Sequence, residues 1–258
     1  MNYGLYLSAS GVLTNMHRQD VIANNLANAS TVGFKRDLAA FTQRLPESQE
    51  DPTDPSLAHD LLDRLGGGMF VRPSETDLRP GQLELTGNDL DLALAGRGFF
   101  AVRAEHHGEQ VTQLTRDGRL TLDTAGRLIT TVGANPVLDR AGQPIRLDPT
   151  APVHVDEAGA IHQRGAAVAQ LKLVDVADAQ TLEHRGNGLY SAPAAAIEAD
   201  RQAPARVRQG AVEGANVQPV QEMVSMIEAN RAISQNATLI RYHDRIMDHA
   251  VNTLGRIA

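Results

Sequence analysis

The last forty-odd residues carry the pattern that most constrains this chain. Apolar side chains recur there at alternating steps of three and four residues, with polar interruptions at Asn230 and Asp244. This spacing is typical of a coiled-coil seam. No proline follows Pro219, a position where a first helical turn tolerates one. The pattern predicts a helix of roughly 58 Å from Val217 to Gly255, with Asn216 as its N-terminal cap.

The N-terminal segment carries a matching apolar stripe, which Gln19 interrupts, and it predicts a helix from about Tyr3 to about Asn28. Two helices with narrow stripes are expected to pair with each other. Such a pair buries only the seam between its members, so other subunits must cover the remaining apolar surface. The first stripe comprises Leu5, Ala9, Val12, Met16, Ala23 and Leu26, and the uncovered side chains of the second helix include Val220, Val224, Ile227 and Leu239.

Between the two helices, from Met69 to about Arg208, the apolar period changes to two, which predicts a β-rich body. The candidate strands are Met69 to Arg72, Leu83 to Thr86, Leu90 to Ala95, Phe99 to Arg103, Gln110 to Thr115, Arg119 to Asp123, Leu128 to Val132, Ile145 to Leu147, Val153 to Val155, Ile161 to Gln163, Ala167 to Val174, Gly188 to Ser191 and Arg206 to Gln209.

A short motif of the form Asp-x-Ala-Gly occurs three times in this body, beginning at Asp123, Asp139 and Asp156. The Asp side chain can accept hydrogen bonds from backbone N–H groups that follow it, and the Gly can adopt a positive φ. Regularly spaced loops of this kind predict an antiparallel meander or a partly closed barrel. Their carboxylate density is too low for calcium loops.

These patterns together predict an α+β fold in which paired terminal helices flank an inserted all-β domain. The acidic, proline-containing segment Pro46 to Pro55 is expected to be an exposed loop, followed by a short helix from Leu57 to Leu65 and a glycine hinge. The expected domains are residues 1–35 with 214–258 as a helical coiled coil, residues 36–68 as a linker or extended segment, and residues 69–213 as a β-rich outer domain.

Composition limits the functions open to this chain. Its 258 residues carry a net charge of −7, which disfavours nucleic acid or an anionic membrane as a partner. It contains no cysteine, which excludes disulfides and thiolate sites, and only 3% aromatic residues, which disfavours stacking platforms for sugars. No run is apolar enough for a membrane span, and the N-terminus lacks the features of a cleaved signal peptide.

Residues that could carry chemistry are scattered. His106 and His107 lie beside Glu109 at an expected hairpin tip, without a third metal ligand at useful spacing. No Gly-x-Ser-x-Gly elbow is present. The turn at residues 96–98 lacks the pattern of a nucleotide-binding loop and is expected to deliver two phenylalanines, residues 99 and 100, to a β core. We therefore expect no catalytic residue, cofactor, metal or small-molecule substrate.

Three segments, in order along the chain, resemble the signatures of one family: the axial proteins of the bacterial flagellum, specifically the basal-body rod proteins. Ile22 to Arg36 (IANNLANASTVGFKR) is similar to the N-terminal signature. Leu90 to Val102 with Leu114 to Thr131 resembles the central β block, and Gln209 to Ile240 resembles the C-terminal signature. The resemblance spans almost the whole chain and favours the proximal rod, with the distal rod or another hook-basal-body protein as the alternative.

The resemblance implies a non-enzymatic structural subunit whose terminal helices form the inner layer of a hollow helical tube. It also implies export through the flagellar type III apparatus without a cleaved signal peptide, a location in the periplasm-spanning rod of the basal body, and partners that are copies of the chain and other axial proteins of rod and hook. The residues expected at the assembly interface are Leu5, Val12, Met16, Asn24, Asn25, Leu26, Asn28, Gly33, Phe34, Met223, Met226, Ile227, Asn230, Ile233, Ile240, Met247, Val251 and Leu254.

A function of another class also fits a β body with a helical stalk, namely a secreted protein that binds cell-wall glycan. The low aromatic content disfavours it. An enzyme is a more distant third, because neither paired carboxylates nor an activated nucleophile can be located.

Overall fold

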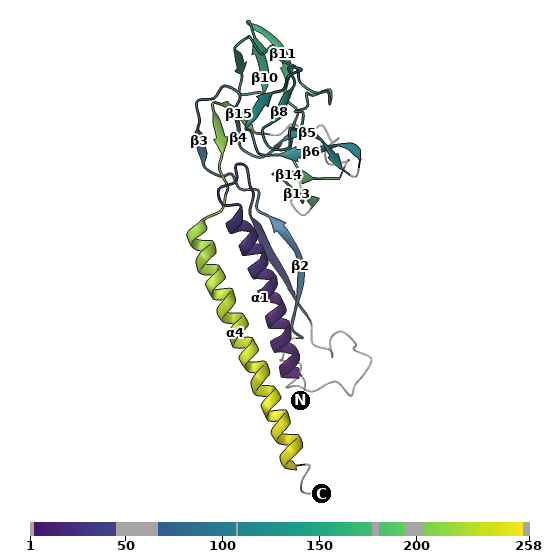
Figure 1. The fold of residues 1–258 in the computed structure, drawn as a ribbon, viewed down its shortest axis with the longest axis vertical. Helices are drawn as coiled ribbons and strands as arrows, with labels where there is room; N and C mark the ends of the chain where they lie inside the picture. The colour runs from purple at the N-terminus through teal and green to yellow at the C-terminus, as the bar shows by residue number, and fades with distance from the viewer. Residues whose placement is uncertain (1–2, 45–66, 107, 177–180, 194–203, 255–258) are drawn as a thin grey trace. The chain divides into compact units, whose positions relative to one another are not determined.

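The computed structural model describes residues 3–44, 67–106, 108–176, 181–193 and 204–254 (Figure 1). The acidic loop and the short helix expected between residues 46 and 65 lie outside this described part. The fold is α+β, with an N-terminal helix, a β-rich middle and a C-terminal helix, as predicted. The chain divides into two compact units. Unit 1 comprises residues 1–26, 37–75 and 219–258, and unit 2 comprises residues 27–36 and 76–218.

Unit 1 contains both helices. Helix α1 spans Tyr3–Ala27, within one residue of its predicted end. Helix α4 spans Pro219–His249 and continues as a π-helical turn, Ala250–Leu254. Pro219 is the first residue of α4, where its missing N–H leaves no intrahelical hydrogen bond unmade.

The two helices lie side by side and run in opposite directions (Figure 1). A Cβ atom added to Gly4 would lie 2.8 Å from the His243 ring, and one added to Gly11 would lie 3.0 Å from the Asn236 amide. Glycine at these two positions therefore allows side chains of α4 to lie directly against the backbone of α1. About two turns further along α1, an Arg18 guanidinium nitrogen lies 3.9 Å from a carboxylate oxygen of Glu228 on α4.

A two-stranded sheet completes unit 1, formed by β1 (Asp37–Gln43) and β2 (Met69–Thr76). The sequence predicted β2 but not β1, because the four apolar residues of β1, Leu38 to Phe41, are consecutive and do not alternate with polar ones. The buried side chain of Asn25 attaches β1 to α1. Its Nδ2 donates to the carbonyl of Asp37 at 2.9 Å, and its Oδ1 accepts the N–H of Asp37 at 2.9 Å.

Unit 2 consists of small antiparallel sheets, and none closes on itself in the part of the chain that is described. The central sheet has the order β12-β5-β6-β14-β13, with β5 (Phe99–His106) paired along its length to β6 (Glu109–Thr115). The remaining strands of this sheet are β12 (Leu173–Val174), β13 (Glu183–Gly186) and β14 (Leu189–Ser191). Three two-stranded sheets pair β3 (Leu83–Leu85) with β16 (Ala211–Glu213), β4 (Leu92–Ala95) with β15 (Arg206–Gln209), and β7 (Leu120–Leu122) with β8 (Leu128–Thr130). A three-stranded sheet has the order β11-β10-β9, formed by β9 (Val153–Val155), β10 (Ala160–Gln163) and β11 (Ala166–Gln170).

Most candidate strands of the β body are confirmed, and the exceptions are short or irregular. The candidate Ile145 to Leu147 is not a strand in the structure, but its central residue Arg146 forms an isolated antiparallel bridge with Arg127. The candidate Ala167 to Val174 is divided between β11 and β12, which belong to different sheets. The sequence did not predict β13, which is largely charged and exposed, or the three-residue strand β16.

The loop prediction for the three Asp-x-Ala-Gly motifs is confirmed. In each motif the Gly N–H donates to the carbonyl of the Asp, and the three glycines have φ of 73°, 75° and 85°. The carboxylates of Asp123, Asp139 and Asp156 each accept backbone N–H groups beyond the turn. The N–H of Arg127 lowers the pKa of Asp123, and the N–H of Ala160 lowers the pKa of Asp156.

Strand β5 carries apolar side chains to two cores. Phe100 and Val102 pack into the larger core, whereas Phe99 and Ala101 belong to a second core that includes the fully buried Tyr190. Alternate residues of a strand point to opposite faces, so the part of β5 that lies between two cores, residues 99–102, is apolar at every position. The expected delivery of two adjacent phenylalanines to the β core is thereby confirmed.

Candidate functional site: exposed helix faces and a buried ion triad

The helices of unit 1 expose much of their apolar surface. In α4, Glu222 and Ala229 are buried, whereas most of the large apolar side chains are exposed. Val220 on α4 and Tyr6 on α1 are each 69% exposed. The exposed large apolar side chains of the two helices are Leu5, Tyr6, Leu13, Met16, Val220, Met223, Val224, Ile227, Leu239, Tyr242, Ile246 and Met247, with Val251 in the following π-helical turn.

On α4 these side chains lie mainly opposite the face that is turned to α1. At 100° per residue, Val220, Val224 and Ile227 lie roughly half a turn from the buried Ala229. We call these three residues, together with Met223, the outward patch of α4. At this spacing the four side chains are neighbours on the helix surface, and in the described part of the chain each is 47–69% exposed.

The predicted interface residues fall into distinct environments. Asn25 is buried within unit 1, and Gly33 and Phe34 are buried within unit 2. Asn230 is exposed and donates its side-chain amide to the carbonyl of Met226, one turn earlier in the same helix. The half-buried members are Val12, Leu26, Asn28, Met226, Ile233 and Ile240, and the exposed members are Leu5, Met16, Asn24, Met223, Ile227, Met247 and Val251. For Leu254 the structure describes the backbone alone.

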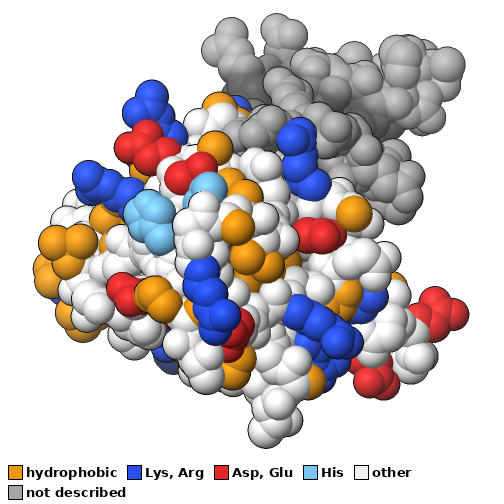
Figure 2. All heavy atoms as spheres, turned by 90° about the horizontal axis from the view of Figure 1, so that it is seen from above, with side chains coloured by type: hydrophobic (Ala, Val, Ile, Leu, Met, Phe, Trp, Pro, Cys, Tyr) orange, Lys and Arg blue, Asp and Glu red, His pale blue; other side chains and the backbone are white. Residues whose placement is uncertain are grey.

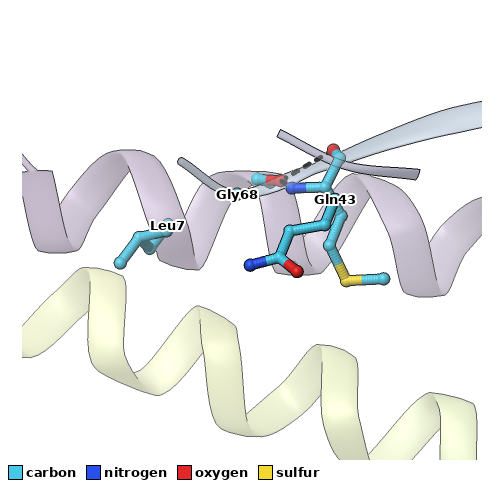
Figure 3. Close-up of a pocket in the computed structure, with 6 residues that line it drawn as sticks. Leu7, Gln43 and Gly68 are labelled. Carbon is cyan, nitrogen blue, oxygen red and sulfur yellow. Dashed lines mark hydrogen bonds between the residues drawn. The ribbon is translucent and has the colours of Figure 1, made fainter. Parts of the chain in front are cut away.

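Two open hollows lie on unit 1. One, of about 370 Å³, is lined by Leu7, Ser10 and Gly11 of α1 together with Gln43, Gly68 and Met69 (Figure 3). Ser10 Oγ closes one side of it by hydrogen bonds of 3.0 Å to the backbone of Met69. The other, of about 390 Å³, is a depression on α4 that begins at Ile227 and has polar residues along the rest of its wall.

Unit 2 contains a buried ion triad formed by Lys35, Arg116 and Glu213. Lys35 Nζ lies 2.6 Å from Glu213 Oε1, and Arg116 Nη1 lies 2.8 Å from Glu213 Oε2. The three side chains are at most 1% exposed. Burial lowers the pKa of Lys35, and the adjacent Glu213 carboxylate opposes this shift.

Backbone groups satisfy most of the remaining hydrogen-bonding capacity of the triad. The carbonyl of Arg79 accepts from Lys35 Nζ at 2.9 Å, and Gly81 N–H donates to Glu213 Oε1 at 2.8 Å. Arg116 donates to the carbonyls of residues 94 and 96, and its guanidinium lies 5.3 Å from the ring centre of Phe99. Its Nε is buried without a hydrogen-bond partner in the described structure. Two cations therefore share one carboxylate, and their carbonyl partners stabilise the excess positive charge.

Beside the triad, Asn216 joins three segments of unit 2. Its Oδ1 accepts the N–H of Arg36 at 2.7 Å, and its Nδ2 donates to the carbonyls of Asp77 and Arg79 at 2.8 and 3.1 Å. The prediction that Asn216 caps the C-terminal helix is wrong, because α4 begins three residues later at Pro219 and the Asn216 side chain is engaged elsewhere.

At three positions around the triad, another segment of backbone lies too close for any residue larger than glycine. A Cβ atom on Gly33, which has φ of 70°, would collide with the backbone of Arg116. A Cβ on Gly81 would collide with the Gly214 carbonyl, and one on Gly118 with the Leu92 carbonyl. Glycine is required where two backbones come this close.

The sequence did not predict the triad. Its members are separated by tens of residues and meet only through the fold. One local feature is shared, since Lys35, Arg116 and Glu213 each lie within two residues of a glycine. On the face shown in Figure 2, by contrast, basic and acidic side chains are interspersed with apolar ones.

The chain thus combines two terminal helices with an inserted β-rich middle. Two family models match the chain: "Flagella basal body rod protein" over residues 5–35, and "Flagellar basal body rod FlgEFG protein C-terminal" over residues 208–253. The second match includes Glu213 and Asn216, and the first includes Lys35.

Relatives match the chain over nearly its whole length. The flagellar basal-body rod protein FlgF of Caulobacter vibrioides is 35% identical over 266 residues, covering all of both chains. FlgF of Rhizobium meliloti is 35% identical with 99% of each chain covered, and FlgG of Buchnera aphidicola is 30% identical with 94% of this chain and 96% of the relative covered. This chain belongs to the family of flagellar basal-body rod proteins. Among the described residues, no helix is long and apolar enough to cross a membrane.

Proposed function

We propose that this chain is a non-enzymatic rod subunit that assembles helically with copies of itself and other axial proteins through the outward faces of α1 and α4. The single observation that carries this proposal is the apolar surface of the helix pair. Val220, Met223, Val224 and Ile227 are 47–69% exposed. Apolar patches of this kind on a helix mark an interface.

A helical tube requires heterologous contacts, in which one surface meets a different surface of the next copy. Unit 1 offers two unlike apolar surfaces, the outward patch of α4 and the α1 surface with Tyr6 and Leu13. On this proposal the helix pair behaves as a coiled coil that forms the inner layer of the tube, with the β-rich domain outside. Polar residues on the outward side of α4, such as Asn230, then restrict the register between copies.

The proximal rod is the favoured position within the axis. Two FlgF relatives are 35% identical with 99% or more of the chain covered, whereas FlgG of Buchnera aphidicola is 30% identical with 94% covered and FlgF of Salmonella typhimurium is 30% identical with 93% covered. We expect delivery through the flagellar type III apparatus without a cleaved signal peptide.

Complementation tests the position of the chain within the axis. The gene is expressed in Caulobacter vibrioides lacking FlgF and, separately, lacking FlgG, and swimming and basal-body completion are scored. We expect rescue of the strain lacking FlgF. Rescue of only the strain lacking FlgG would place the chain in the distal rod, and rescue of neither, despite normal folding and export, would count against a rod subunit.

A matched pair of variants tests the surface. Ile227→Lys places a charge in the outward patch, and Gln221→Lys places the same charge at an exposed polar position of the same helix. We expect Ile227→Lys to abolish rescue and Gln221→Lys to retain it. Equal rescue by both variants would show that the outward patch is not the interface.

A further inference from the structure

The first and the last segments of unit 2 are bonded directly to each other. Residues 27–36 form the first segment; the chain then passes through unit 1 over residues 37–75 and returns at residue 76, and residues 211–218 are the last part of unit 2. Gly33 N–H donates to the Glu213 carbonyl at 2.6 Å, and Asn216 N–H donates to the Phe34 carbonyl at 3.3 Å. The Lys35–Glu213 ion pair joins the same two segments.

The direction of these bonds decides how the pair of segments responds to force. Gly33 bonds to Glu213 and Phe34 to Asn216, so both segments run in the same direction. Tension on the chain pulls the entering segment towards its N-terminal side and the leaving segment towards its C-terminal side. For two parallel segments these pulls are opposite and lie along the shared axis, so the segments are sheared rather than peeled apart.

Shear loads all the bonds between two segments at once, whereas peeling breaks them one after another. The bonds here include the buried ion pair and the hydrogen bond from Arg36 N–H to Asn216 Oδ1 at 2.7 Å. A buried ion pair that is separated leaves uncompensated charges in an apolar environment, which is strongly unfavourable. The ion pair is therefore the bond that resists the first displacement most strongly.

We propose that residues 33–36 and 213–216 form a mechanical clamp that carries tension between the two ends of unit 2 and keeps that tension off the β body. Tension entering at Lys35 leaves at Glu213 without passing through the residues between them, which are residues 37–75 of unit 1 and the β body from residue 76 onwards. Arg116 acts as a positioning residue in this clamp, since it holds the second oxygen of the Glu213 carboxylate at 2.8 Å.

Single-molecule pulling on the full chain tests the clamp. Because the chain has no cysteine, paired cysteines give unique attachment points. Ser30→Cys with Gln218→Cys, both at exposed positions, loads the clamp in shear. Thr124→Cys with Glu157→Cys, at exposed loop positions of unit 2, loads the β body without shearing the clamp. The readout is the unfolding rate of unit 2 at constant force.

Lys35→Met is compared with Ile161→Ala, which removes a fully buried side chain of the larger core. Along the 30–218 axis, we expect Lys35→Met to raise the unfolding rate by on the order of a hundredfold or more, and Ile161→Ala to raise it less. Along the 124–157 axis, the two variants should change the rate by similar factors.

The contrast between the two axes decides the outcome, because a residue that only stabilises unit 2 would act alike along both. If Lys35→Met changed the rate equally along both axes, or left the 30–218 axis unchanged, the clamp proposal would be overturned. Should Lys35→Met not fold, Asn216→Ala is used in its place. It keeps the three side chains of the triad and removes the bond from Arg36 together with the two bonds that Asn216 donates to the carbonyls of residues 77 and 79. The same two outcomes support or overturn the proposal.

Discussion

The two units of this chain differ in the energetically unfavourable feature that each contains: exposed apolar side chains in unit 1 and buried charges in unit 2. Unit 1 exposes apolar side chains such as Val220 and Tyr6, whereas unit 2 buries the charges of Lys35, Arg116 and Glu213. Exposed apolar surface is unfavourable in a single copy and becomes favourable when another molecule covers it. Buried charges are tolerated because the same chain supplies their counter-charge and most of their hydrogen-bond partners. Unit 2 therefore satisfies its buried charges within one copy, whereas unit 1 leaves apolar side chains exposed to solvent.

The largest effect is expected where one partner of the triad is removed. Glu213→Ala leaves two cations buried without a carboxylate and should lower the free energy of unfolding by about 3–5 kcal/mol. Urea unfolding followed by tyrosine fluorescence measures it. The control replaces all three residues, as Lys35→Met, Arg116→Met and Glu213→Leu together, and should recover most of the loss. A triple variant as unstable as Glu213→Ala would show that packing, not charge, controls this region.

A smaller effect is expected at the glycines of unit 2. Gly118→Ala forces a collision with the Leu92 carbonyl and should cost more than about 2 kcal/mol. Gly142→Ala is the matched control, because no atom lies within 4 Å of the added Cβ and only the positive φ of 75° is strained. It should cost about 1 kcal/mol. Equal losses in thermal unfolding would contradict the close approach of residues 92 and 118.

Acid should weaken unit 2 through its turns. Asp123 and Asp156 have pKa values below the ordinary 3.8, so their contribution to stability is present above about pH 4 and is lost as pH falls through the lowered values. Asp123→Asn with Asp156→Asn keeps an oxygen acceptor in each turn but cannot titrate. Unfolding midpoints below pH 4 should fall less steeply for this double variant than for the parent chain. Parallel curves would rule out these two turns as a source of acid sensitivity.

The smallest effect on the isolated chain is expected in unit 1. Val224→Glu lies in the outward patch at 52% exposure and should change the stability of the monomer by no more than about 0.5 kcal/mol. It should nevertheless prevent concentration-dependent association, as measured by sedimentation velocity. A large loss of monomer stability would mean that unit 1 covers this side chain itself.

Sequence reasoning succeeded where structure follows from neighbouring residues. Helix α1, most strands of the β body and the three Asp-x-Ala-Gly turns depend on periodicity or on bonds across four residues. It failed where structure depends on distant segments. The triad joins residues 35, 116 and 213, and the apparent helix cap at Asn216 is instead a bridge to Arg36, 180 positions away. No local pattern distinguishes these two roles of an asparagine.

The triad also constrains the order in which the chain can fold. Lys35 and Glu213 are 178 positions apart, so a chain that emerges N-terminus first must keep the lysine solvated until nearly all of the β body has followed. Loop closure over such a separation is slow. Formation of the triad is consequently a late step in the folding of unit 2. It requires residue 213 to be present, and a chain truncated before that residue cannot complete it.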